Sequence, residues 1–311
     1  MSEYASAVER ARRAFASLSQ IEGALARAPA RRDLQTNLVA FRKLAIQSQD
    51  QLLKLSALKQ IEVCNYRLLP EATEHYSLGY VSESLLAYQN LFSQVHDALR
   101  NGPKVRARLD KEALQESALD FAYSYSGSLG VVLFIQNERD FFTGKIDPSI
   151  DTLLQVLNID TRAAVRQIAE SLGAAVVKRV HDWSRANIDG GFATDVRWNR
   201  SDGRQLGGVI ERKKMETIVD LIVATSDEKT QVIEATGMLV GADITSGSFH
   251  FTVPNGPDYR GHLAEEFSRE TEMVIGKTYK ARIRERQTVV YATEKVDVVR
   301  GLIALISPTS S

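Results

Sequence analysis

The sequence has a single cysteine, Cys64, among its 311 residues. One thiol cannot form an internal disulfide framework, and it cannot supply the several thiolates of a cysteine-rich zinc site. Such low cysteine content is typical of a protein from a reducing compartment. We therefore expect a cytoplasmic protein.

Long hydrophobic runs are also missing. The longest apolar stretches are Gly130–Ile135 and Gly301–Ile306, far short of the roughly 20 residues that a helix needs to cross a bilayer. Residues Met1–Tyr4 do not begin a basic segment followed by an apolar one, so we expect no signal peptide. These absences predict a protein without a membrane partner.

The sequence has no excess of either charge. Its 39 lysine and arginine residues equal its 39 aspartate and glutamate residues, which gives a formal net charge of zero. Whole-chain charge therefore gives no reason to expect attraction to nucleic acid or to a membrane surface. Only local charged surfaces remain as candidates.

Catalytic signatures and metal-ligand spacings are not found. His262 precedes Glu265 and Glu266 at a spacing that is not typical of metal sites, and Cys64 has no attributable histidine partner. We therefore expect no cofactor and no bound metal. The sequence favours a binding protein over an enzyme, although it leaves enzyme activity open.

The N-terminal part has the spacing of long packed helices. Asp33 is a suitable N-cap, and apolar residues then recur at steps of three and four, which predicts a helix from Leu34 to about Arg67. A further helix is expected from Val81 to Leu99. A single helix cannot bury such a stripe, so we expect a helical bundle or coiled-coil arm that forms a homo-oligomer or docks on a protein partner. The candidate interface residues are Leu38, Phe41, Leu52 and Leu55.

The C-terminal part changes to the alternating pattern of β-strands. Five short strands in about eighty residues, with glycines at positions where a sheet can bend, predict a small antiparallel barrel of OB-like or SH3-like type. The expected strands are near Val232–Val240, Phe249–Val253, Tyr279–Arg286, Val289–Thr293 and Val298–Ile306.

The two patterns together predict an α+β protein in three parts. The helical arm is expected over residues 1–125 and the barrel over residues 230–311. A mixed α+β domain is expected between them, over residues 126–229, with a buried strand near Leu129–Gln136. The sequence does not decide whether this middle domain shares a core with the barrel.

One expected barrel strand carries a row of basic residues. Period-two geometry places Lys280, Arg282 and Arg284 on one face of the strand, and Arg286 follows if the strand continues. Such a row can hold a nucleic-acid backbone, but it can also be a solvated face neutralised across the sheet. Residues 230–311 hold nine Lys and Arg against ten Asp and Glu, a net charge of −1, which opposes the nucleic-acid interpretation.

A weak nuclease pattern lies in the middle part. An acidic residue followed by Glu-x-Lys on a strand can hold a metal ion and a phosphate. Asp202, Glu211 and Lys213 match these letters, but Glu211 can equally begin a solvated helix.

These observations rank three hypotheses. The first is a non-catalytic binding or scaffolding protein that self-associates or docks on a protein partner through its N-terminal helices. The alternative is a nucleic-acid-binding protein that uses the basic strand face. The third is a metal-dependent nuclease.

Overall fold

The structure is a computed structural model that describes residues 3–71, 76–125, 129–138, 144–268, 271–293 and 295–307. The chain forms two compact units, Met1–Ala224 and Thr225–Ser311. It has a mixed α+β fold with a helical N-terminal region and a C-terminal closed barrel of five strands, as the sequence predicted at this level. No helix within the described ranges is long and apolar enough to cross a membrane.

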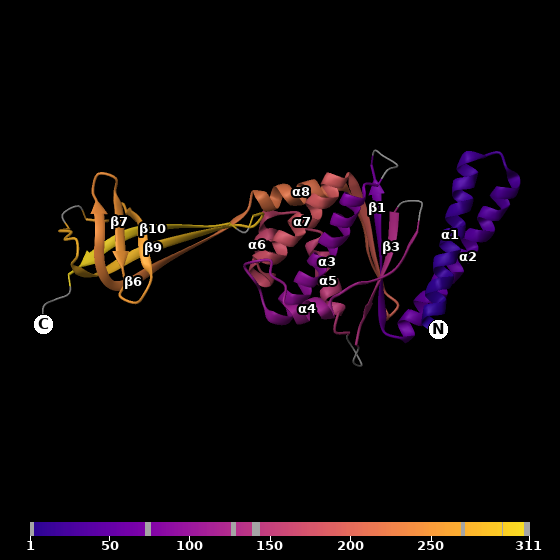
Figure 1. The fold of residues 1–311 in the computed structure, drawn as a ribbon, viewed down its shortest axis with the longest axis horizontal. Coiled ribbons are helices and arrows are strands. Elements are labelled where there is room, and N and C mark those ends of the chain that lie inside the picture. Colours follow the sequence, from indigo (N-terminus) through magenta and orange to yellow (C-terminus); the bar gives the residue numbers. More distant parts are fainter. Residues whose placement is uncertain are drawn as a thin grey trace. The chain divides into compact units, whose positions relative to one another are not determined.

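The first unit is built around an antiparallel sheet with strand order β2-β3-β1-β4-β5 (Figure 1). Its strands are β1 (Ile61–Pro70), β2 (Asp120–Tyr125), β3 (Leu129–Gln136), β4 (Phe192–Asn199) and β5 (Gln205–Ile210). Its helices are α1 (Glu3–Arg27), α2 (Arg32–Leu58), α3 (Leu78–Asn101), α4 (Lys111–Glu116), α5 (Asp147–Val156), α6 (Arg162–Leu172), α7 (Ala174–Gly190) and α8 (Arg212–Val223).

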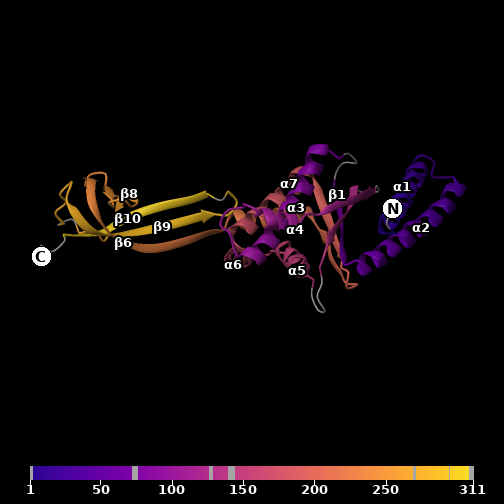
Figure 2. The same cartoon turned by 60° about the horizontal axis from the view of Figure 1, so that its bottom comes forward.

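Helices cover both faces of this sheet. The hairpin of α1 and α2 lies on one face, and α3, α5 and α7 lie on the other (Figures 1 and 2). Because side chains alternate along a strand, successive residues of β1 face the two layers. Val63 packs with Leu52 in the cluster under the hairpin, whereas the Cys64 Sγ lies 3.4 Å from the Tyr88 hydroxyl of α3.

The layer between the sheet and helices α3 and α7 contains a buried hydrogen-bond network. The indole Nε1 of Trp183 donates to the Tyr66 hydroxyl, and that of Trp198 donates to the Tyr88 hydroxyl, each at 3.0 Å. The Tyr66 hydroxyl also lies 2.8 Å from the Ser84 hydroxyl. Each of these large side chains therefore keeps a hydrogen-bond partner while its ring is buried.

Helices α1 and α2 form an antiparallel hairpin, and most of the buried residues between them are small. Arg10 donates to Gln51 at 2.9 Å, and Arg42 pairs with Glu22 at 3.1 Å nearer the turn. Alanine and serine allow two helix backbones to approach closely. The buried residues of the two helices are Ala7, Ala11, Ala14, Ala45, Ser48, Leu52 and Ser56.

The expected helix to Arg67 is wrong beyond Leu58. Gln60 has a left-handed backbone with φ of 55°, which ends the helical geometry, and Ile61–Pro70 form β1. This strand pairs with β3 and β4, so a segment of the predicted helical arm is the central strand of the sheet. The boundary expected after residue 125 falls between β2 and β3 of the same sheet.

The second unit is the barrel, with strand order β10-β8-β7-β6-β9. Only the β10–β8 pair is parallel. Phe251, Tyr279 and Leu302 fill its interior together with other apolar side chains. The strands are β6 (Ser226–Asp243), β7 (Ser248–Thr252), β8 (Asp258–Leu263), β9 (Thr278–Val290) and β10 (Lys295–Ile306).

Candidate functional site: the groove between α1 and β2

The basic stripe, defined as Lys280, Arg282, Arg284 and Arg286, lies on the outer face of β9. All four cations have a carboxylate partner. Glu234 of β6 lies 2.9 Å from the Lys280 Nζ and 3.7 Å from the Arg282 Nε. The distances to the partners of Arg284 and Arg286 are 2.9 Å to Glu266 and 3.1 Å to Glu228.

These pairs neutralise the stripe. The hydrogen bond from Lys280 holds the pKa of Glu234 below its usual value, so that carboxylate keeps its charge beside the cations. The barrel also offers no exposed ring for a base to stack on, because its aromatic side chains are buried. They are Phe249, Phe251, Tyr259, Phe267, Tyr279 and Tyr291.

The residues of the weak nuclease pattern lie at the two ends of β5. Asp202 is in the turn before this strand, and Glu211 follows it as the N-cap of α8, with Lys213 on that helix. A six-residue strand at about 3.3 Å per residue separates the first carboxylate from the other two groups by about 20 Å. Among the residues that the structure describes, no group of three or more His, Cys, Asp or Glu could hold a metal ion.

Asp202 instead belongs to a buried charged cluster around Arg200. The Arg200 guanidinium pairs with Asp147, and it lies 3.2 Å from Asp151 and 3.4 Å from Asp202. Partial burial raises the pKa of Asp202, but hydrogen bonds from Arg204 and the charge of Arg200 outweigh it, so the pKa is lowered. The carboxylates are held by cations, and the cluster ties the β4–β5 turn to α5.

The four candidate interface residues have different surroundings on α2. Leu52 is buried and Leu55 packs beside it in the cluster between the hairpin and the sheet. Leu38 and Phe41 are half-buried nearer the turn of the hairpin. The sheet of the same chain therefore covers the C-terminal half of the stripe.

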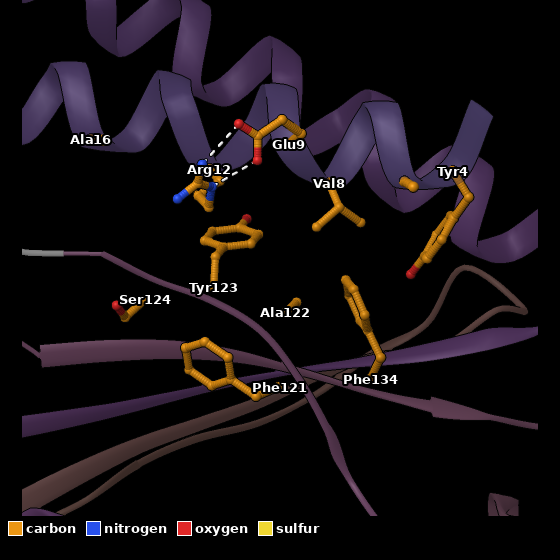
Figure 3. Close-up of a pocket in the computed structure, with 11 residues that line it drawn as sticks. Tyr4, Val8, Glu9, Arg12, Ala16, Phe121, Ala122, Tyr123, Ser124 and Phe134 are labelled. Atoms are coloured by element: carbon orange, nitrogen blue, oxygen red, sulfur yellow. Dashed lines mark hydrogen bonds and ion pairs between the residues drawn. The ribbon is translucent and has the colours of Figure 1, made fainter. Parts of the chain in front are cut away.

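An open groove lies between helix α1 and strand β2 (Figure 3). It has a volume of about 660 Å³, and its floor is aromatic. The rings of Tyr4 and Phe134 lie 5.5 Å apart there. The Glu9 carboxylate accepts two hydrogen bonds of 2.8 Å from Arg12 at the upper wall, so this wall carries little net charge.

Strand β2 gives the groove an open sheet edge. It is the terminal strand of the sheet order, and within the described residues no strand pairs with its outer side. A β-bulge between Phe121 and Tyr123 shifts the pairing with β3. Tyr123 points toward α1 (Figure 3) and is buried, whereas the Phe121 side chain lies at the edge and is 63% exposed. An open strand edge beside an exposed ring is suited to pairing with another extended chain.

The sequence did not predict this groove. Strand β2 is six residues long and begins soon after α4, so it does not stand out as a separate element in the sequence. Phe121 was the residue in the sequence that could have pointed to the groove, but a single aromatic residue does not identify a sheet edge. The sequence matches no protein-family model, and comparison with curated proteins and with solved structures gives no match either.

Proposed function

We propose that this chain is a non-catalytic binding protein, and that the groove between α1 and β2 holds an extended segment of a protein partner. The observation that carries the proposal is the open edge of β2, with Phe121 exposed beside the groove.

Strand addition is the mode of binding that this groove supports. An extended peptide beside β2 pairs with the outer backbone groups of the strand, and its alternate side chains enter the groove. The rings of Phe121 and Phe134 and the Val8 side chain favour apolar side chains at these positions. Glu9 and Arg12 are already paired with each other, so the groove does not select a partner of one charge.

The helical hairpin forms the second wall of the groove, which agrees with a docking role for the N-terminal helices. A coiled-coil interface with a second copy is the other occupant that the predicted stripe of Leu38 and Phe41 supports. The two occupants differ in their effect on the oligomeric state. The single buried Cys64 supports a cytoplasmic location for either one.

We infer an OB-type barrel for the second unit. The support is its strand order: β6, β7 and β8 follow as a meander, β10 is parallel to β8, and β9 closes the barrel between β10 and β6. OB barrels often bind oligonucleotides, which keeps nucleic-acid binding as the alternative function. The paired cations and buried rings make it less favoured than docking at the groove.

Selection from a random-peptide display library on the full-length protein tests the proposal. We expect enrichment of peptides with alternating apolar residues, and loss of their binding in Phe121→Asp. The control is Leu86→Asp, because Leu86 is 62% exposed on α3, away from the groove. Enrichment that is equal for the wild type and Phe121→Asp would refute groove docking. A wild-type dimer that Phe121→Asp converts to a monomer would identify a second copy as the occupant.

A further inference from the structure

A second cavity, of about 310 Å³, lies between the helical hairpin and the centre of the sheet. This cavity is more polar than the groove, and Asp195 is the one acidic residue in its lining. Its volume is at the lower end of the range of about 300–1,000 Å³ that is usual for small-molecule sites. Its lining residues come from six elements: Phe15, Gln49, Asn65, Arg67, Tyr123, Tyr125, Asp195, Arg197 and Gln205.

Four polar residues form the floor of this cavity. Asn65 and Arg67 are two apart on β1, and Asp195 and Arg197 are two apart on β4, so all four face the hairpin. The strand register pairs Asn65 with Arg197 and Arg67 with Asp195. Directly opposite residues have Cβ atoms about 4.5–5.5 Å apart, so the four groups converge on one small area of the sheet.

The floor carries two guanidinium groups and one carboxylate. The buried Asp195 carboxylate accepts a hydrogen bond of 2.8 Å from the Arg197 Nε, and it lies 3.5 Å from an Arg67 nitrogen. Two guanidinium groups thus share one carboxylate among the lining residues. The hydrogen bond with Asp195 also raises the pKa of Arg197, which therefore keeps its positive charge.

Asn65 places a side-chain amide in the lining of this cavity. The residue is 8% exposed, and its side-chain amide forms no hydrogen bond within the described part of the chain. The amide faces the cavity, so a ligand bound there can form a hydrogen bond with it. The amide lies beside Arg197 in the register, so one ligand group can contact both.

An aromatic wall borders the polar floor. The Phe15 ring of α1 lies 6.2 Å from the Tyr123 ring and 5.2 Å from the Tyr125 ring. Tyr125 lies flat across β3 because Gly130 has no side chain. A Cβ at Gly130 would be 2.2 Å from the Tyr125 ring. This glycine therefore lets the ring reach toward the arginines.

We propose that this cavity binds a small organic anion of the nucleoside monophosphate class. Arg67 and Arg197 hold the phosphate, because guanidinium groups form paired, charge-assisted hydrogen bonds with phosphate oxygens. The flat base lies against the wall of Phe15 and Tyr125, and Asn65 provides a further polar contact. This ligand site is distinct from the groove, so it does not depend on the proposed docking of a partner.

Isothermal titration calorimetry of the full-length protein with AMP, GMP, CMP and UMP tests this proposal. Inorganic phosphate, adenosine and benzoate serve as probes of the separate ligand parts. We expect at least one nucleotide to bind in a 1:1 ratio and more tightly than phosphate or adenosine. Tighter binding of benzoate than of every nucleotide would overturn the nucleotide assignment, and heat from none of the seven compounds would overturn the site.

Matched variants locate any binding that is found. We expect Arg197→Gln to weaken the nucleotide by about tenfold or more, because a charge-assisted hydrogen bond is lost. Arg204→Gln is the control, since Arg204 also pairs with an aspartate but lies outside the cavity. Phe121→Asp should leave nucleotide binding unchanged, which separates this site from the groove. Equal affinity of the wild type and Arg197→Gln would refute the assignment.

Discussion

Replacing Arg200 by methionine removes the central cation of the charged cluster in the first unit. The Arg200 side chain is 1% exposed and that of its partner Asp147 is 6% exposed, so both charges are shielded from water. Methionine fills much of the same volume with apolar atoms. The Asp147 carboxylate remains buried and loses its cation.

The expected cost is about 3 kcal/mol, the lower end of the range of about 3–5 kcal/mol for removing one partner of a buried ion pair. The lower end applies because Asp147 keeps hydrogen bonds that include those from the Gly144 backbone N–H at 2.9 Å and from the Asn137 amide at 2.8 Å. The pairs with Asp151 and Asp202 add little, since these carboxylates are partly exposed and screened by water.

Urea unfolding, monitored by tryptophan fluorescence, measures the change in the free energy of unfolding of the first unit. Both tryptophans, Trp183 and Trp198, lie in the first unit, so the barrel does not contribute to the signal. With a slope of about 2–3 kcal/mol per molar urea, the midpoint should fall by about 1 M or more. Arg204→Met is the matched control. Arg204 is 60% exposed in the same turn, and losing its pair with Asp202 should cost under about 1 kcal/mol.

A double variant tests the cause of the destabilisation. If the cost comes from a buried carboxylate that has lost the Arg200 cation, Arg200→Met with Asp147→Asn should be more stable than Arg200→Met alone, because the amide carries no charge. An Arg200→Met midpoint within about 0.3 M of the Arg204→Met midpoint would show that the cluster is not a buried charge network. The reasoning would then be wrong.

Three further predictions follow from the structure. Burial raises the pKa values of Cys64 and Tyr66 to about 12, so the folded state keeps protons that the unfolded state releases above its pKa values of 9.0 and 10.0. The free energy of unfolding should therefore fall as the pH rises from about 9 toward 12, and a thiol reagent at pH 8 should modify Cys64 only after unfolding. Gly130→Ala should displace the Tyr125 ring and cost about 1–3 kcal/mol in the urea assay, whereas an unchanged midpoint would show that the ring has room to move. Generic single- and double-stranded DNA and RNA should bind weakly at low salt in fluorescence anisotropy, and Glu234→Gln should strengthen this binding because it releases two cations of the basic stripe. Strong binding that is abolished when Lys280, Arg282 and Arg284 are all replaced by glutamate would establish the nucleic-acid function instead.

The helical elements could be predicted from the sequence because one face of each is buried. The helix expected from Val81 to Leu99 is α3, and Gly102 ends it with φ of 87°. The central strand β1 could not be recognised in the same way. Its residues Glu62–Tyr66 are buried on both faces, so the alternation typical of a half-buried strand is absent. The helical spacing before it then extended the expected helix too far.

The number of barrel strands was predicted, and four of the five expected strands coincide with β6, β7, β9 and β10. The expected strand Val289–Thr293 is not a separate strand: Val289 and Val290 are the end of β9, and residues 291–293 form a turn. Strand β8 was missed. Its sequence, Asp258 to Leu263, is mostly polar or glycine, and only its two apolar residues, Tyr259 and Leu263, pack in or against the core.

The two candidate sites depend on contacts between distant segments. Arg67 and Arg197 become neighbours only through the register of β1 and β4, which local spacing does not encode. The groove likewise requires that β2 be the terminal strand of the sheet. The basic stripe was visible in the sequence because it lies on one strand, but its acidic partners come from other segments.

The position of β1 between β3 and β4 has a consequence for the synthesis of the protein. Residues 61–70 leave the ribosome well before their second neighbour, β4, which ends at Asn199. At about 5–20 residues per second, the intervening 129 residues take roughly 6–26 s to translate. During this interval the nascent β1 has an apolar, unpaired edge that chaperones or other nascent chains can bind. The central strand of the finished sheet therefore gains its second partner only late in translation.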